Sequence, residues 1–369
     1  MAKLRVGIVF GGRSVEHEVS VASATSILSA LDPNHYDTTL IAISHDGRWY
    51  LGARGMLPAS VDQGEEVTLP AVPGDGRLVS RASGEPAARL DVVVPIVHGS
   101  GGEDGTLQGF LELAGVPYVG AGVLGSAVQM DKDVAKRLLR AAGIPVVPWV
   151  AIRAHQLAAD EAGCVARAID EIGLPAFVKP ANAGSSVGIG KVTTRDELGP
   201  ALRHAARFDT KVLVERALDA REIEVAVLGN DAPEASVPGE IIPESDWYDY
   251  ESKYVDEQTE LVVPAELPQA LSDELRRTAL EAFAILEGAG MARVDYFVER
   301  ETGTWYLNEL NSLPGFTEVS MYPRLWQASG LSYPALLDRL IELALERARA
   351  KRALETTYRR GSIGSDSAT

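Results

Sequence analysis

Apolar residues near the start of the chain predict a buried strand followed by a helix. Residues 4–10 form an apolar, β-branched run of strand length, which ends at Gly11 and Gly12. Beyond this glycine turn, apolar side chains recur at helical spacing at Val21, Ala24, Ile27, Leu28 and Leu31. A strand-length run followed by a helical period indicates a βα unit.

Two further apolar runs extend this pattern. Residues 39–43 and 92–97 have the length and composition of buried strands. Strands of this type pack under helices in a mostly parallel sheet, and ligands collect at their carboxyl ends. The intervening residues 52–90 are rich in Gly, Pro and Ser with weak periodicity, so we expect an insertion or an edge hairpin there.

The rest of the chain predicts two more units. Gly143 and Pro145 end a helix over residues 132–142. The second unit has predicted strands at 176–179 and 212–215 and predicted helices at 162–172 and 197–207. The third unit begins near Glu222 and closes with a helix over 333–352.

These patterns divide the chain into four parts. We predict an N-terminal α/β substrate domain over 1–128, a central subdomain over 129–220 and a C-terminal subdomain over 221–356. The last part, 357–369, consists mostly of small and polar residues, and we expect it to be disordered. The length of 369 residues fits two or three compact domains.

Charge narrows the range of partners. The chain has 35 basic and 52 acidic residues and a formal net charge of −17. Such a chain repels polyanions at long range, so we expect neither nucleic acid nor an acidic membrane surface as a partner. Any bound anion therefore needs a local cationic pocket.

Cysteine use and hydropathy indicate the compartment. The one cysteine, Cys164, cannot form an internal disulfide, which is typical of a reducing environment. The N-terminal apolar run is too short for a signal peptide, and no 18-residue apolar window occurs. We therefore expect a cytoplasmic protein without a membrane anchor.

A lysine and a small-residue loop predict a phosphate site. Lys179 ends an apolar strand, where an unpaired ammonium is costly, and the sequence GSSVGIGK begins five residues later. The spacing is not that of a Walker A loop, but Ser185, Ser186 and nearby backbone N–H groups suit phosphate oxygens. The alternative is a lysine that extends to solvent from a strand end.

A predicted hairpin brings oxygen ligands together. If a three-residue loop pairs position 300 with 304, Asp295 lies opposite Glu309, and Asn311 shares that face. Two facing carboxylates destabilise a sheet unless a cation joins them, and these oxygen ligands suit Mg²⁺ beside nucleotide phosphates. The alternative is a solvent-exposed hairpin face.

Other candidates surround this face. Arg293 precedes Asp295 by two residues, and the backbone N–H of Gly315 follows the hairpin, so both are candidates for stabilising an oxyanion. The aromatic, charged segment DWYDYESKY ends at Lys253 and Tyr254 and is typical of a lid. Glu215 and Glu222 lie at strand ends, where they either recognise ribose or adenine or face solvent.

Six motifs in order identify a family. They are GGRSVEHEVS at 11–20, HGSGGEDGTLQ at 98–108, MDK at 130–132, the Lys179 loop, YDYESKY and NELNSLPGFT. Over about residues 4–350 the chain resembles the D-alanine:D-alanine ligases of the ATP-grasp superfamily. The resemblance implies an α/β ATP-grasp fold, in which an N-terminal parallel α/β domain precedes two α+β domains that clasp ATP.

The resemblance assigns roles to the candidates. It implies that Glu16 orients the ammonium of the first D-alanine and forms a hydrogen-bonded set with Ser185 and Tyr254. His98 matches a histidine near that substrate, and Ser320 matches the group that holds the carboxylate of the second. The implied ATP residues are Lys132, Lys179, Ser186 and the lid lysine Lys253, with Glu215, Ala217, Leu218 and Glu222 around the nucleoside.

The resemblance also implies the metal site and the oxyanion donors. Asp295, Glu309 and Asn311 match ligands of two Mg²⁺ ions, for which Mn²⁺ substitutes. Arg293 and the Gly315 N–H match the oxyanion donors.

The implied activity is ATP-dependent synthesis of D-alanyl-D-alanine for peptidoglycan. The reaction passes through D-alanyl phosphate, and a homodimer is implied. Tyr254 favours D-alanine as the second substrate, since relatives that make D-alanyl-D-lactate lack a tyrosine there. The alternatives are an ATP-grasp ligase with another acceptor, such as D-lactate or D-serine, and a non-catalytic nucleotide-binding protein of the same fold.

Overall fold

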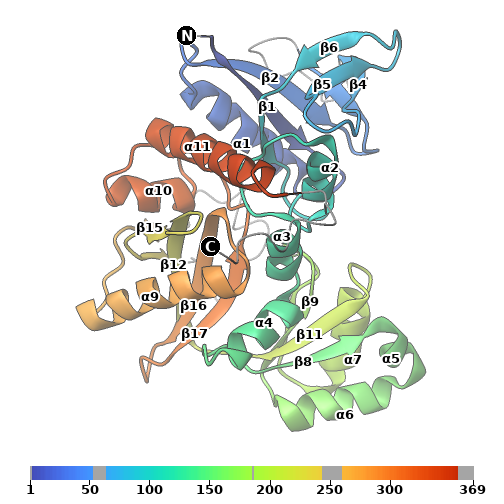
Figure 1. Cartoon of the computed structure of the whole chain (residues 1–369). Coiled ribbons are helices and arrows are strands. Elements are labelled where there is room, and N and C mark those ends of the chain that lie inside the picture. Colours follow the sequence, from blue (N-terminus) through green and yellow to red (C-terminus); the bar gives the residue numbers. More distant parts are fainter. Residues whose placement is uncertain (1, 53–63, 185–186, 243–259, 356–369) are drawn as a thin grey trace, which may run out of the picture.

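The computed structural model describes residues 2–52, 64–184, 187–242 and 260–355. Within them, three β-sheets follow one another along the chain (Figure 1). The strand order of the first sheet is β6-β5-β4-β3-β2-β1-β7. Its parallel part consists of β1 (Leu4–Gly11), β2 (Tyr36–Ile43) and β7 (Val92–Ile96), with α1 (His17–Ala30) and α2 (Thr106–Ala114) beside it.

Antiparallel strands widen this sheet on the β2 side. They are β3 (Trp49–Leu51), β4 (Glu65–Thr68), β5 (Arg77–Ser80) and β6 (Pro86–Arg89). The segment 52–90, expected to be an insertion or an edge hairpin, therefore supplies three strands of the main sheet. Its strands have only four residues each, which is too short for a clear alternation of apolar and polar positions.

The second sheet is antiparallel, in the order β10-β9-β11-β8. Its strands are β8 (Trp149–Arg153), β9 (Ala176–Pro180), β10 (Gly190–Val192) and β11 (Lys211–Arg216). Its helices are α5 (Ala154–Ala159), α6 (Glu161–Glu171) and α7 (Arg195–Ala205). Cys164 is buried in the core of this unit, as a small apolar side chain would be.

The third sheet contains the predicted hairpin. Its strands are β12 (Ala220–Gly229), β13 (Glu234–Ala235), β14 (Gly239–Ile242), β15 (Glu260–Val262), β16 (Gly290–Glu299) and β17 (Trp305–Asn311). Its helices are α9 (Gln269–Ile285), α10 (Met321–Ala328) and α11 (Tyr333–Arg352). The helix predicted over 333–352 is confirmed.

The register of this hairpin corrects the sequence prediction at one end. The turn pairs Glu299 with Thr304, not 300 with 304, so the loop has four residues. A β-bulge at Asn308 then shifts the register, and Asp295 does lie opposite Glu309. The predicted facing of the two carboxylates is confirmed, but the assumed loop length is wrong. A bulge inserts one residue without changing the hydrophobic pattern enough to be read from sequence.

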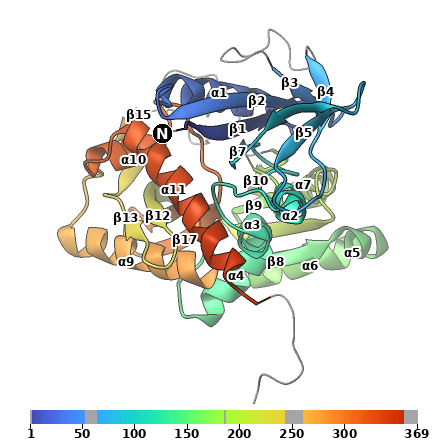
Figure 2. The same ribbon diagram turned by 45° about the horizontal axis from the view of Figure 1, so that its top comes forward.

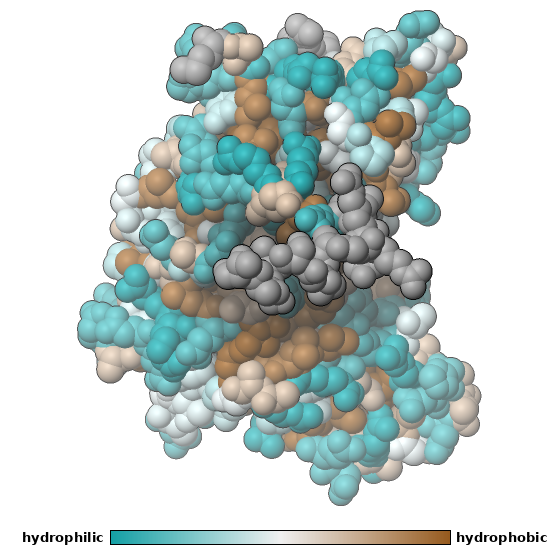
Figure 3. Space-filling view, viewed as in Figure 1, coloured by the Kyte–Doolittle hydropathy of each residue, from teal (hydrophilic) through white to brown (hydrophobic). Residues whose placement is uncertain are grey.

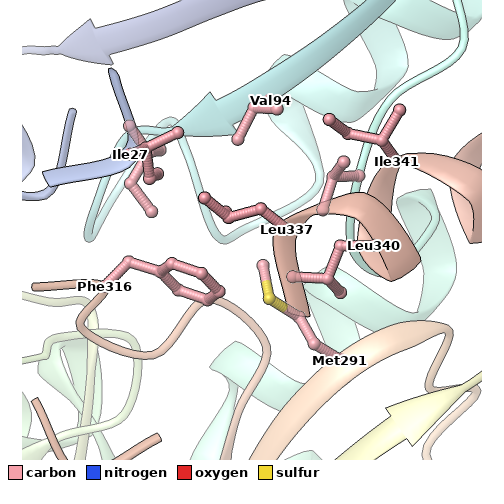
Figure 4. A pocket seen from close by; sticks show the side chains of 9 residues that line it. Ile27, Val94, Met291, Phe316, Leu337, Leu340 and Ile341 are labelled. Atoms are coloured by element: carbon pink, nitrogen blue, oxygen red, sulfur yellow. The ribbon is translucent and has the colours of Figure 1, made fainter. Parts of the chain in front are cut away.

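Two helices link the units. α4 (Lys132–Ala141) follows α3 (Val123–Met130), and its Ala135 and Leu139 pack into the core of the third sheet. α11 lies between the first and third sheets (Figure 2), and its leucines share one core with α1 and β7. A small apolar cavity lies in this shared core, lined by Ile27, Val94, Ile96, Val119, Met291, Phe316, Leu337, Leu340 and Ile341 (Figure 4).

The predicted domain limits at 128/129 and 220/221 stay predictions. Each sheet lies within one predicted unit, except that β12 begins at Ala220, one residue before the predicted limit. The helix α11 packs against both the first and the third unit. The tail 357–369 lies outside the described residues. None of the helices in the described ranges combines the length and apolar composition needed to cross a membrane.

The shared core predicts a stability effect. Leu336 on α11 is fully buried, so Leu336→Ala is expected to lower the free energy of unfolding by about 2–5 kcal/mol. Leu113→Ala is the matched control, because Leu113 is 66% exposed and its loss is expected to change the free energy by less than about 0.5 kcal/mol. Denaturant and thermal unfolding measure both. Equal effects would contradict a core shared between α11 and the first sheet.

Candidate active site

The predicted site residues that the structure describes lie in loops and at strand ends of all three units. On the face seen in Figure 3, hydrophobic side chains gather in the middle, between more hydrophilic surfaces above and below. The first sheet contributes loops after β1 and β7, the second contributes the end of β9, and the third contributes β16 and β17. The contacts below join these elements directly.

His98 joins the first unit to the loop after β17. Its Nδ1 lies 3.2 Å from the carbonyl oxygen of Leu313, which can only accept, so Nδ1 carries the proton. The Ser23 hydroxyl then donates to Nε2 over 3.1 Å. Burial lowers the pKa of His98 to about 4, so the ring is neutral near pH 7. His98 thus fixes the loop that contains Gly315.

Glu16 lies in a pocket made by two glycines. Its side chain is buried at the start of α1, and its Oε2 approaches Gly99 and Gly184. A Cβ atom built on Gly99 would be 2.4 Å from Oε2, and one on Gly184 would be 2.8 Å away. Both distances are shorter than an ordinary non-bonded carbon–oxygen contact, so a side chain at either position requires the Glu16 carboxylate to move. The carboxylate therefore sits between the loop after β7 and the loop after β9.

Lys132 connects the second and third units. Its Nζ lies 3.2 Å from Glu309 Oε2 and donates to the Ala183 carbonyl over 2.8 Å. Burial lowers the pKa of this lysine, but the Glu309 carboxylate more than offsets burial and the pKa is raised overall. Lys132 is therefore a buried cation held between the hairpin and the loop that leads to Ser185.

Asp295 is the centre of an ion-pair network on the hairpin. Arg293 donates to both of its carboxylate oxygens over 2.8 and 2.7 Å, and Asn311 Nδ2 donates to Oδ2 over 2.8 Å. Arg293 also lies 3.0 Å from Glu224, the residue opposite Asp295 on β12. Burial alone lowers the pKa of Arg293, but Asp295 and Glu224 raise it well above its usual value. Glu224 was not identified from the sequence, although it lies two residues from Glu222 on the same strand face.

The hairpin residues fit a divalent cation. Asp295, Glu309 and Asn311 provide two carboxylates and one amide on one face, which is the oxygen-only set that Mg²⁺ takes. Cationic groups of Arg293 and Lys132 already contact these carboxylates, so the face attracts positive charge. Asn311 presents its nitrogen to Asp295, and rotation of the amide offers Oδ1 instead. In the part of the chain described, no three His, Cys, Asp or Glu side chains form a metal-binding cluster.

Lys179 and Glu215 form a buried ion pair. Lys179 Nζ lies 2.6 Å from Glu215 Oε2 and donates to Asn308 Oδ1 over 3.4 Å. Glu215 is 3% exposed, so it is not a solvated strand end. Its second oxygen faces Lys136, a residue that the sequence analysis did not consider. Burial raises the pKa of Glu215, but the two lysines lower it more, so the carboxylate is ionised.

Glu103 is a second group that the sequence analysis missed. It is buried next to His98 and accepts a hydrogen bond from the Gly99 N–H over 2.8 Å. Burial first, and then the charge of Glu16, raise its pKa to about 8, against the smaller effects of the Gly99 hydrogen bond and of Lys132. No pattern in the sequence separates Glu103 from the neighbouring Asp104, which is not buried.

Gly315 and Ser320 lie together after the hairpin. A Cβ on Gly315 would be 3.1 Å from Ser320 Oγ, so the two residues are in close contact. Ser320 Oγ accepts from the Thr317 N–H over 3.1 Å at the start of α10. Ser185, Ser186, Lys253 and Tyr254 lie outside the described residues. Ala217 and Leu218 lie in the link between β11 and β12, and Glu222 lies on β12.

Two family models match most of the chain. The model described as "D-ala D-ala ligase N-terminus" matches residues 5–121, and the model described as "D-ala D-ala ligase C-terminus" matches 138–342. The chain belongs to the D-alanine–D-alanine ligase family. The resemblance found in the sequence is therefore confirmed.

Individual ligases agree with this assignment. The D-alanine–D-alanine ligase A of Chromobacterium violaceum is 49% identical over 366 residues, with 96% of this chain and 98% of that protein covered. The solved D-alanine-D-alanine ligase of Coxiella burnetii is 40% identical with a TM-score of 0.85, covering 95% of this chain and 97% of that one. The VanG D-Ala:D-Ser ligase of Enterococcus faecalis is 33% identical with a TM-score of 0.83, covering 93% and 100%. The predicted ATP-grasp fold is confirmed.

Glu103 predicts how the stability of the ligand-free ligase depends on pH. Its pKa of about 8 in the folded chain exceeds the ordinary value of 4.5, so the folded state binds a proton that the unfolded state releases between these values. Stability from this group is therefore full below pH 4.5 and is lost as the pH rises through about 8. The facing charges are Glu16, Lys132 and Glu309.

Glu103→Gln tests this dependence, because Gln keeps an uncharged acceptor for the Gly99 N–H. We expect the variant to unfold at a higher temperature than the wild type at pH 9. Its free energy of unfolding should exceed that of the wild type by about 1.4 kcal/mol for each unit of pKa shift removed. Glu274→Gln, on an exposed position of α9, is the control and should follow the wild type. A Glu103→Gln protein with an unchanged pH profile would rule out a protonated Glu103.

Proposed function

We propose that this site joins two D-alanines with the consumption of ATP, through D-alanyl phosphate. The chain is an ATP-dependent D-alanine–D-alanine ligase by its family and its relatives, and its dipeptide serves peptidoglycan synthesis. The observation that carries the site assignment is Lys132, whose buried ammonium joins the carboxylate of Glu309 to the loop after β9. Positive charge and oxygen ligands thus meet where three units converge.

The first step transfers the γ-phosphoryl group of ATP to a carboxylate oxygen of the first D-alanine. The new P–O bond forms as the bond from the γ-phosphorus to the ADP oxygen breaks. Lys132 and Lys179 offset the charge of the transferred group, with Ser186 at the phosphates. Mg²⁺, held by Asp295, Glu309 and Asn311, supplies further charge neutralisation when bound.

Glu16 positions the first substrate. Its carboxylate pairs with the ammonium of D-alanine, since the glycines at 99 and 184 leave its Oε2 in close contact with both loops. Ser185 and Tyr254 complete a hydrogen-bonded set with Glu16. His98 lies beside this position in its neutral form, so it does not compete with the ammonium for the carboxylate.

The second step forms the peptide bond. The amine of the second D-alanine attacks the carbonyl carbon of the acyl phosphate, and inorganic phosphate leaves after a proton is lost from nitrogen. Arg293 and the Gly315 N–H stabilise the oxyanion of the tetrahedral intermediate. Ser320 holds the carboxylate of the second substrate, because its hydroxyl lies against Gly315.

Several finer assignments belong to the same proposal. Glu215, Ala217, Leu218 and Glu222 bind the nucleoside, and Lys253 closes over the phosphates and substrate as part of a lid that excludes water. Two Mg²⁺ ions act, with Mn²⁺ as a substitute. The ligase forms a homodimer and acts in the cytoplasm, where ATP is available.

Product analysis separates the candidate acceptors. A solved neighbour is a D-Ala:D-Ser ligase, so D-serine and D-lactate are offered beside D-alanine, with ATP and Mg²⁺. We expect ADP release to rise on addition of D-alanine alone and mass spectrometry to identify D-alanyl-D-alanine as the main product. A rate of phosphate release that does not rise on addition of D-alanine would refute the proposal. A mixed dipeptide or an ester as the main product would show that the second substrate is D-serine or D-lactate instead.

The glycine pocket around Glu16 makes a second prediction. In Gly184→Ala the new methyl group displaces the Glu16 carboxylate, so we expect the KM for the first D-alanine to rise about tenfold or more while ATP binding changes little. Gly190→Ala is the matched control, because a Cβ there meets nothing within 4 Å. A Gly184→Ala enzyme with normal KM for D-alanine would argue against Glu16 as the ammonium partner.

A further inference from the structure

Lys136 is a fully buried lysine that the proposed mechanism does not use. It lies on α4, one helical turn after Lys132, so the two side chains point from the same helix face. Its exposed fraction is 1%, and it is among the largest buried side chains of the molecule. An ammonium in such a place costs folding free energy unless an anion lies next to it.

The anion next to Lys136 is Glu215. Lys136 Nζ lies 3.1 Å from Glu215 Oε1, while the other oxygen of the same carboxylate lies 2.6 Å from Lys179 Nζ. Two buried ammonium groups therefore share one buried carboxylate. The three residues come from α4, β9 and β11, so the arrangement spans the helix and the sheet beneath the proposed phosphate site.

The surroundings of Lys136 offer little else. Among the described residues its Nζ has no hydrogen bond of good geometry, and the Trp149 ring lies 5.9 Å from it. Burial lowers the pKa of Lys136 to about 8, partly offset by Glu215. The charge is thus retained near neutral pH at a position where a methionine side chain has a similar length and no charge to desolvate. This choice needs a reason other than packing.

We propose that Lys136 is a positioning residue for ATP, which holds one oxygen of Glu215 and offsets its charge so that Lys179 keeps its positive charge for the phosphates. Lys179 and Glu215 alone form a neutral pair. With Lys136 the three charges sum to +1, next to Lys132. This inference rests on the proposed role of Lys179 at the ATP phosphates.

The inference predicts a loss of phosphate affinity on removal of the charge. Lys136→Met keeps the length of the side chain and leaves a neutral Lys179–Glu215 pair. We expect the Kd for Mg-ATP, measured by calorimetry, to rise by roughly tenfold or more, because one unit of positive charge is lost at close range. The Kd for adenosine, which has no phosphate, should change far less. An equal loss for ATP and adenosine would overturn the inference in favour of simple distortion of the nucleoside pocket.

A double variant separates charge from packing. Lys136→Met with Glu215→Gln restores the sum of +1. Because Glu215 is also proposed to bind the nucleoside, the affinity for Mg-ATP is divided by the affinity for adenosine in each variant, and this ratio should be higher in the double variant than in Lys136→Met alone. If Lys136→Met does not fold, the double variant is compared with Glu215→Gln, in which the charges of Lys136, Lys179 and residue 215 sum to +2. The double variant should then bind Mg-ATP more weakly than Glu215→Gln, with similar adenosine affinities. Equal ATP affinities in that comparison, or no recovery in the first, would overturn the inference.

The controls distinguish this inference from the proposed function. Lys351→Met removes a lysine that is 61% exposed and should leave the Kd for ATP unchanged. If the wild type neither binds Mg-ATP nor turns over with D-alanine, the proposed function is wrong. If the wild type is active and Lys136→Met binds Mg-ATP with wild-type affinity, only the role of Lys136 is wrong.

Discussion

Pairing of buried positive charge is the interaction on which the rest of the site depends. Lys132, Lys136 and Lys179 are all almost fully buried, and each has a carboxylate within 3.2 Å. Because a buried ammonium without a partner is costly, these lysines require Glu215 and Glu309 to come to them from other strands. The requirement aligns α4 with the second and third sheets. An acidic protein thus builds a local cationic centre without a basic surface.

Neutral polar contacts hold the remaining unit in place. His98, uncharged because it is buried, reaches the carbonyl of Leu313 in the third unit, and Ser23 completes its hydrogen bonds. The shared apolar core under α11 stabilises the same junction. Charge pairing therefore sets the arrangement around the phosphates, whereas neutral hydrogen bonds and packing set it around the first amino acid.

The sequence predicted the parts of the site that depend on local pattern. The facing of Asp295 and Glu309 followed from strand alternation and a nearby turn, and the burial of Lys179 followed from its apolar strand. Lys136 and Glu103 could not be found in this way. Lys136 pairs with Glu215, which lies 79 positions further along the chain. Glu103 is affected by its burial and by the charge of Glu16 from another loop, and only the tertiary fold decides both. Ser185, Ser186, Lys253 and Tyr254 were candidates from the composition of their loops and took their specific roles from the family resemblance. They lie outside the described residues.

The bulge at Asn308 separates the two ends of the hairpin. Toward the turn, residues pair in one register, and toward the carboxylates they pair in another. Asn308, the extra residue of the bulge, accepts a hydrogen bond from Lys179 through its side-chain oxygen. Changes in the length or sequence of the turn at 300–303 can therefore be absorbed before they reach Asp295. A substitution at this tip therefore need not alter the geometry of the carboxylates at the other end of the same two strands.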